Sequence, residues 1–145
     1  THDPDTGDLT VRHAGLVGTV VRADEVPGLV DEVPILAVAA ACADGETRFE
    51  GVGELRVKES DRLATVESEL GRMGADVRAE GDTLVVRGGP LRGAPVVSHH
   101  DHRIAMSCAV AGLVADGPTV IDGWDAVATS YPGFIDHLVA LREGA

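Results

Sequence analysis

Aromatic side chains are scarce in this 145-residue chain, since Phe, Tyr and Trp together make up 3% of it. A core built around large rings is therefore excluded, and the apolar content of 44% must come mainly from Ala, Val and Leu. Small aliphatic side chains allow helices to pack closely on sheets. The composition therefore favours one compact α/β domain.

Cysteines are also rare, and both Cys42 and Cys108 lie within apolar stretches. This excludes a disulfide framework, and we expect each cysteine to be a small buried side chain. The sequence has no apolar run as long as a membrane span and no signal peptide at its start, so the expected location is the cytoplasm. Because the chain begins at Thr1 without an initiator Met, we expect a fragment of a longer protein.

Basic residues are few: 12 Lys and Arg stand against 24 Asp and Glu, which gives a formal net charge of −12. A general affinity for nucleic acid or an anionic membrane is disfavoured, because both need a basic face. A small anionic substrate is compatible with this charge, since a few focused cations can set the local potential of a cleft. The clusters that contain basic residues are therefore the candidate binding sites.

Hydrophobic periodicity predicts an alternation of helices and strands. Two Ala-rich apolar runs indicate buried helices, the first with Pro34 tolerated in its first turn, and two segments with one apolar stripe indicate amphipathic helices. The predicted helices span 33–43, 59–75, 100–117 and 131–144. The predicted strands span 8–14, 16–23, 46–52, 75–80, 83–88 and 118–124, with 75–88 forming a hairpin.

The chain also repeats itself. Residues 43–47 (Ala-Asp-Gly-Glu-Thr) return as 115–119 (Ala-Asp-Gly-Pro-Thr), an offset of 72 residues. Each copy runs buried helix, turn, strand and amphipathic helix. We therefore expect two similar α/β units, about 17–88 and 89–145, packed side by side on one core.

Polar residues gather just before each buried helix, at 29–32 in the first unit and at 101–103 in the second. If the units superpose, these residues occupy equivalent positions. A third cluster, at 54–62, mixes cations and carboxylates at the start of an amphipathic helix. Free N–H groups and the positive end of the helix dipole could help to hold an anion there.

Each cluster also has an ordinary structural explanation. Capping and the helix dipole favour the acidic run 59–61, and Arg62 can simply be solvated. Asp31, before an apolar helix, is commonly an N-cap. The histidine-rich run 99–102 lacks thiol partners and zinc-ligand spacing, so we predict no metal site and expect Asp101 to cap a loop.

Five motifs occur together in one order: LVDEVPILAVAAA, LRVKESDRL, a GA-V hairpin, HDHRIAM and TSYPGF. In this order and spacing, over about 17–141, the chain resembles the 5-enolpyruvylshikimate-3-phosphate synthases. KESDR and DHRIAM together are specific to that family. UDP-N-acetylglucosamine enolpyruvyl transferase shares the fold and chemistry but differs in those two motifs, and it is the alternative enzyme. A non-catalytic anion-binding domain that kept the fold is the alternative of another class.

The resemblance implies an architecture. Family members have two domains, each an inside-out α/β barrel of three repeated βαβαββ units, and substrates bind in the cleft between the domains. This chain would supply two units of the C-terminal domain. The third unit and the other domain would lie upstream of Thr1, and the chain alone would be inactive.

The resemblance also implies a reaction, the transfer of the carboxyvinyl group of phosphoenolpyruvate to the 5-hydroxyl of shikimate 3-phosphate. Phosphate is released, in the pathway to aromatic amino acids. Addition followed by elimination needs an acid and a base but no cofactor or metal. By resemblance, the phosphate and carboxylate of phosphoenolpyruvate would be bound by Lys58, Arg62 and Arg103, because forked guanidinium donors bind oxygens in pairs.

The remaining roles also follow from the resemblance. Asp31 would contact the 5-hydroxyl and act as its base, Glu59 would transfer protons at the enolpyruvyl methylene, and His102 would orient this network. Two positions depart from the family pattern. Thr129 stands where many members carry Lys, and Glu54 stands where some carry a neutral residue.

Overall fold

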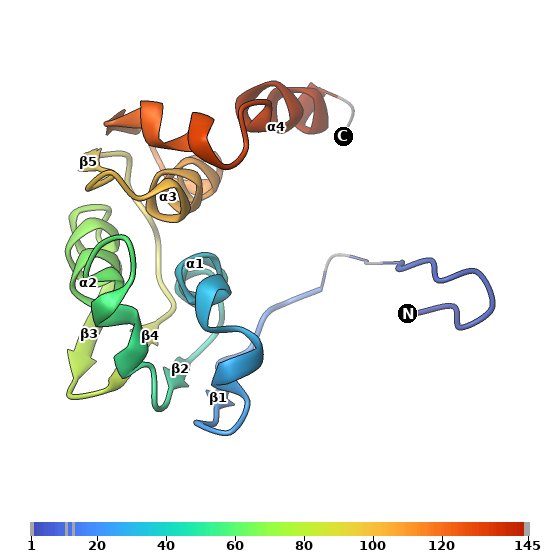
Figure 1. Cartoon of the computed structure of the whole chain (residues 1–145), viewed down its shortest axis with the longest axis vertical. Coiled ribbons are helices and arrows are strands. Elements are labelled where there is room, and N and C mark those ends of the chain that lie inside the picture. The colour runs from blue at the N-terminus through green and yellow to red at the C-terminus, as the bar shows by residue number, and fades with distance from the viewer. Residues whose placement is uncertain (1, 11, 13, 144–145) are drawn as a thin grey trace.

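The computed structural model describes residues 2–10, 12 and 14–143, and it contains two small sheets packed with helices (Figure 1). The strands are β1 (Val20–Val21), β2 (Glu46–Phe49), β3 (Asp76–Glu80), β4 (Thr83–Arg87), β5 (Pro95–Val97) and β6 (Val120–Asp122). The α-helices are α1 (Val33–Ala41), α2 (Arg62–Arg72), α3 (His102–Val114) and α4 (Phe134–Glu143). Short 3-10 helices are η1 (Val26–Gly28), η2 (Val30–Glu32), η3 (Gly53–Val57) and η4 (Trp124–Thr129). The predicted α/β class is confirmed.

The first half of the chain, residues 17–88, forms a four-stranded sheet in the order β1-β2-β4-β3. β1 pairs parallel with β2, and the other neighbours are antiparallel. The predicted hairpin is confirmed, with Glu80 opposite Thr83 and Gly81 in the left-handed conformation that the tight turn requires. Helices α1 and α2 bury their apolar side chains against this sheet.

Local sequence explains where these helices begin and end. Pro34 lies in the first turn of α1, where its missing N–H costs nothing. Asp61 caps α2 by accepting a hydrogen bond of 3.0 Å from the Ala64 amide. Gly74 follows α2 with φ +85°, a conformation that favours glycine. The apolar stripe predicted for α2 is buried: Leu63, Val66, Leu70 and Met73.

The second half, residues 89–143, contains the parallel pair β5-β6 together with α3 and α4. Each half contains the same kind of close backbone crossing at a glycine. Gly18 N donates to Asp44 O at 2.7 Å in the first half, and Gly93 N donates to Asp116 O at 2.8 Å in the second. A Cβ at either glycine would lie 2.3 Å from a carbonyl oxygen of the crossing segment. Only glycine fits at these two positions.

Several predicted elements differ from the structure. Strand β5 was not predicted, because a three-residue strand that begins with Pro95 carries little periodicity. The predicted strand 8–14 is wrong where it is described, since this segment has only an isolated bridge between His2 and Leu9; residues 11 and 13 lie outside the described part. The last helix begins at Phe134, after Pro132.

The prediction that both cysteines are buried is half wrong. Cys108 is buried on α3, and burial raises the pKa of its thiol to about 12. Cys42 is exposed at the C-terminal end of α1, because the helix turns that position away from the sheet. An apolar run alone does not reveal which face of a helix packs.

Candidate functional site

The Arg62 side chain is the centre of the charged cluster. It lies in the first turn of α2 and is only 1% exposed. Its Nε donates to Asp101 Oδ2 at 2.8 Å, its Nη1 to Asp31 Oδ1 at 2.9 Å and its Nη2 to Glu59 Oε2 at 2.5 Å. One guanidinium therefore joins carboxylates from three separate segments, with the planar fork that suits such pairing.

Asp101 is the buried counter-ion of this arginine, and it is fully inaccessible. It caps α3 by accepting from the Arg103 amide at 2.9 Å, and it accepts the Ser60 hydroxyl at 3.0 Å. Burial raises the pKa of Asp101, but Arg62 and these donors together hold it below its ordinary value. The Asp101 carboxylate is therefore ionised at neutral pH.

Two further cations lie nearer the surface. Lys58, the single lysine of the sequence, has its Nζ 3.4 Å from Asp31 Oδ1 and 2.5 Å from Glu54 Oε1. Arg103 Nη1 donates to the Asp31 carbonyl at 2.9 Å and to Glu32 Oε1 at 3.0 Å. Burial raises the pKa of Asp31, but Lys58, Arg103 and Arg62 lower it overall. Asp31 is thus an ionised carboxylate among three cations.

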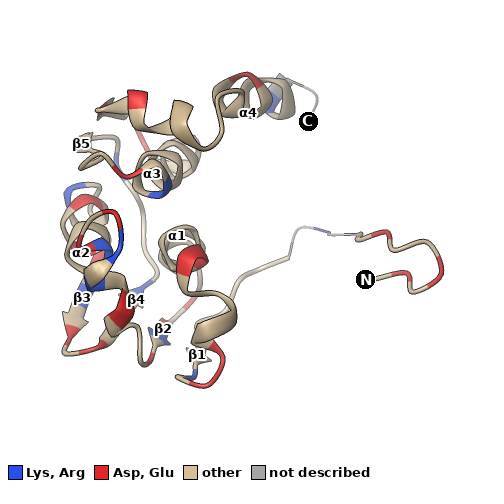
Figure 2. Cartoon of the chain, in the orientation of Figure 1, with Lys and Arg blue, Asp and Glu red and all other residues tan. Residues whose placement is uncertain are grey.

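The two cations nearer the surface can exchange their carboxylate partners for a bound anion. Figure 2 shows the charged segments at the starts of α1, α2 and α3. The Glu54 and Glu32 side chains are more than half exposed, so their ion pairs with the cations contribute little stability. An incoming anion can replace these two carboxylates at Lys58 and Arg103, whereas the buried Arg62–Asp101 pair stays in place.

The structure brings together five of the six predicted site residues: Asp31, Lys58, Glu59, Arg62 and Arg103. No hydrogen bond or ion pair joins the His102 side chain to any other described residue. Thr129 is exposed and donates its hydroxyl to the Ala126 carbonyl at 2.7 Å, within η4.

Sequence reasoning missed the second function of Asp101 and the part played by Ser60. Asp101 was expected only as a cap, and it does cap α3, but it also neutralises Arg62 across 39 residues of sequence. A long-range pair of this kind has no local periodicity. The sequence offered one signal for this pair: an acid lies close to an arginine both at the start of α2 and at the start of α3.

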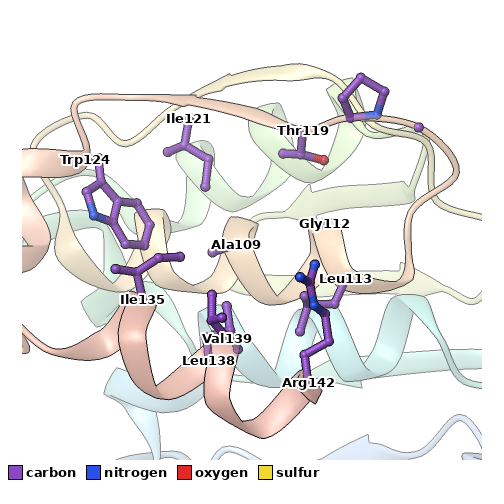
Figure 3. Close-up of a pocket in the computed structure, with 12 residues that line it drawn as sticks. Ala109, Gly112, Leu113, Thr119, Ile121, Trp124, Ile135, Leu138, Val139 and Arg142 are labelled. Carbon is purple, nitrogen blue, oxygen red and sulfur yellow. The ribbon is translucent and has the colours of Figure 1, made fainter.

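A large apolar cavity lies away from the charged cluster. It has a volume of about 510 Å³ and lies between α3, β6 and α4 (Figure 3). The side chains that point into it include Ile121 of β6, Trp124 of η4, and Ile135 and Val139 of α4. Its apolar lining offers no acid, base or anion-binding group apart from Arg142 at one end. The charged cluster is therefore the candidate site for chemistry.

Among the residues that the structure describes, no three or more His, Cys, Asp and Glu side chains come close enough to hold a metal ion. Within the same part of the chain, no helix combines the length and the apolar character that crossing a membrane requires.

Comparison with known proteins identifies the family of this chain. The family model of EPSP synthase (3-phosphoshikimate 1-carboxyvinyltransferase) matches residues 3–138. The chain is 56% identical over 138 residues to the 3-phosphoshikimate 1-carboxyvinyltransferase of Herpetosiphon aurantiacus, covering 94% of this chain and 32% of that protein. It is 54% identical over 137 residues to the protein of the same name from Gloeobacter violaceus, with 94% and 32% covered.

A solved structure gives the same result. The EPSP synthase from Acinetobacter baumannii superposes with a TM-score of 0.81 and 44% sequence identity, over 84% of this chain and 29% of that one. The chain therefore spans about a third of the length of the relatives that it matches. It belongs to the EPSP synthase (3-phosphoshikimate 1-carboxyvinyltransferase) family.

Proposed function

We propose that this chain supplies one wall of the active site of a 3-phosphoshikimate 1-carboxyvinyltransferase. The parent protein would transfer the enolpyruvyl group of phosphoenolpyruvate to shikimate 3-phosphate in the pathway to aromatic amino acids, in the cytoplasm. The observation that carries the proposal is the charged cluster around Arg62, which joins two accessible carboxylates and two exchangeable cations. Such a cluster suits a small substrate with both phosphate and carboxylate groups.

In this proposal the cations bind phosphoenolpyruvate. Lys58 and Arg103 would leave Glu54 and Glu32 and bond the substrate oxygens, which costs little because those pairs are exposed. Arg62 would offer Nη2 after Glu59 moves, while its Nε stays bonded to Asp101. A guanidinium anchored on one side is preorganised for an anion on the other.

The two carboxylates would move the protons. The oxygen of the 5-hydroxyl attacks C2 of phosphoenolpyruvate, Asp31 takes the hydroxyl proton, and C3 gains a proton with Glu59 as the acid. Glu59, now a carboxylate, takes a proton back from C3 of the intermediate. The bond from C2 to the phosphate oxygen breaks, and phosphate leaves with the proton that Asp31 had taken. Asp31 can accept this proton because it is ionised at neutral pH, since the neighbouring cations lower its pKa. His102, at the first position of α3, would join this network on substrate binding.

The upstream part of the parent protein is the proposed partner of this chain. In the first half, β4 pairs with β2 and buries Leu84 and Val86 against α1 and α2. In the second half the corresponding space between α3, β6 and α4 is the apolar cavity of about 510 Å³. We propose that the two halves are two units of one three-unit domain, and that upstream residues cover this cavity.

Phosphate release by the parent protein tests the proposal. Phosphoenolpyruvate would be supplied with shikimate 3-phosphate, with UDP-N-acetylglucosamine or with no acceptor. Release that depends on shikimate 3-phosphate is expected. Release only with UDP-N-acetylglucosamine would favour the related transferase, and no release with either acceptor would favour a non-catalytic anion-binding domain.

A further inference from the structure

A second buried acid lies on α2, two turns after Arg62. The Glu69 side chain is 1% exposed, and its contacts reach outside its own helix. Its Oε2 accepts from the Val97 amide at 2.9 Å, and its Oε1 lies 3.1 Å from His99 Nε2. Ser68 Oγ donates to Oε1 at 2.6 Å. A buried carboxylate must be paired in this way, and two of the partners here, Val97 at the end of β5 and His99, lie at the segment that leads into α3.

That segment is a turn with an unusual backbone. His99 and His100 have φ values of 54° and 60°, in the left-handed region that residues other than glycine rarely adopt. Such a conformation costs free energy and persists only where the surroundings hold it. β6 holds one side of the turn, since Ser98 N donates to Asp122 O and Ser98 Oγ to Gly123 O, both at 2.9 Å. Glu69 holds the other side.

The same turn delivers Asp101. The Asp101 amide donates to Ser98 O at 3.0 Å, and its carboxylate then faces Arg62 Nε at 2.8 Å. α2 is thus joined to the turn twice, through Arg62 to Asp101 and through Glu69 to Val97 and His99. Burial raises the pKa of Glu69, but its hydrogen-bond donors and Arg72 lower it overall, which keeps the carboxylate ionised.

We propose that Glu69 is a positioning residue for the anion site: by holding the strained turn 98–101, it fixes Asp101 and, through Asp101, the orientation of the Arg62 guanidinium. This inference rests on the proposed function, because the site it adjusts is the proposed phosphoenolpyruvate site. Glu69 itself contacts no substrate. Its loss should therefore weaken phosphoenolpyruvate binding more than it slows turnover.

The experiment compares Glu69→Gln with Glu67→Gln in the full parent protein. Glu67 lies two residues earlier on α2 and accepts the Ala79 amide at 3.0 Å, so it matches Glu69 in chemistry but faces β3 instead of the turn. We expect Glu69→Gln to raise the KM for phosphoenolpyruvate about tenfold, with kcat and the KM for shikimate 3-phosphate nearly unchanged. Glu67→Gln should change none of the three. A purely structural role would lower Tm in Glu69→Gln without a selective change in KM, and that result would overturn the inference.

A second variant, at the protein surface, tests the same contact if Glu69→Gln does not fold. His99→Asn removes the ring but keeps a residue that tolerates positive φ, at a side chain that is 44% exposed. We expect a smaller rise in the same KM, and the double variant should be no worse than Glu69→Gln alone. An unchanged KM in both single variants, or a fully additive double variant, would contradict the proposal.

Amide hydrogen exchange separates this inference from the proposed function. We expect residues 97–101 to exchange faster in Glu69→Gln than in Glu67→Gln, whether or not the parent shows activity. A parent that releases no phosphate would remove the proposed function and leave this measurement standing. Equal exchange of 97–101 in the two variants would overturn the positioning role of Glu69 by itself.

Discussion

The two halves of the chain contain similar elements, but the first half is closed, with the apolar face of its second helix buried, and the second half is open, with its second helix partly uncovered. Leu63 of α2 is fully buried, whereas Ile135 of α4, 72 residues later, is 43% exposed. β2 has a strand on each side, and β6 pairs only with β5 among the described residues. The charged cluster draws most of its side chains from the closed half and only Asp101 and Arg103 from the open one. Both halves therefore hold Arg62: the packed first half supplies the helix that carries it, and the second half supplies its buried counter-ion, Asp101.

The largest expected difference between the halves is in catalysis. In the parent protein, Glu59→Gln should lower kcat by a factor of about 10² to 10⁴, because it removes a proposed acid at the reacting carbon. Asp136→Asn, in the first turn of α4, is the matched control and should leave kcat unchanged. The measurement is phosphate release at saturating substrates, with circular dichroism to check the fold. Retained turnover in Glu59→Gln would remove its assigned role.

The next largest difference separates two helix caps. Asp101→Ser keeps a good cap for α3 but leaves Arg62 buried without its main counter-ion, and should cost about 3–5 kcal/mol of unfolding free energy in the parent protein. Asp61→Ser keeps a good cap for the exposed start of α2 and should cost only about 0–0.5 kcal/mol. Urea unfolding of both variants measures the difference. Equal losses would mean that the buried pair adds nothing beyond capping.

A third comparison tests whether the cavity beside α4 is uncovered. Leu63→Ala should destabilise the isolated chain by about 2–5 kcal/mol, because it leaves a cavity under α2. Ile135→Ala should cost less than about 1 kcal/mol there, since much of that side chain is already in water. In the parent protein the cost of Ile135→Ala should rise towards that of Leu63→Ala if upstream residues cover the cavity. The same small cost in both proteins would show that the cavity stays open.

The smallest expected effect concerns pH. Arg62 outweighs burial and holds the pKa of Asp101 below its unfolded value, so its stabilisation is full above about pH 4 and is lost as pH falls through the folded-state pKa. The Tm of the parent should therefore fall more steeply than that of Asp101→Ser as the pH drops below about 4, and the two curves should converge. Parallel curves measured by differential scanning fluorimetry would contradict an ionised Asp101.

Periodicity and turn residues were enough to predict the α/β class, the four helices and the hairpin. These features depend on residues close in sequence, such as Pro34 in a first turn or Gly81 between two strands. Strand β5 was missed because three residues carry no period, and the start of α4 was missed because the segment before it, which contains Pro132 and Gly133, carries none either.

The candidate site divides in the same way. Resemblance to a known family supplied Asp31, Lys58 and Glu59, which lie in recognisable motifs. Asp101 and Glu69 were not predicted as partners of distant residues, because their importance comes from contacts between 28 and 39 residues away along the chain. Folding alone brings such pairs together, and no local rule anticipates them.

The two glycine crossings define a sequence spacing that can identify further repeat units in the parent protein. Gly18 and Gly93 each follow an apolar residue by two positions, and each passes over the aspartate of an Ala-Asp-Gly turn. No larger residue fits at either crossing, so a steric requirement explains why both copies have glycine at this spacing. A leucine, a glycine two residues later and an Ala-Asp-Gly turn about 25 residues beyond should therefore mark any further copy of the unit when the upstream sequence is read.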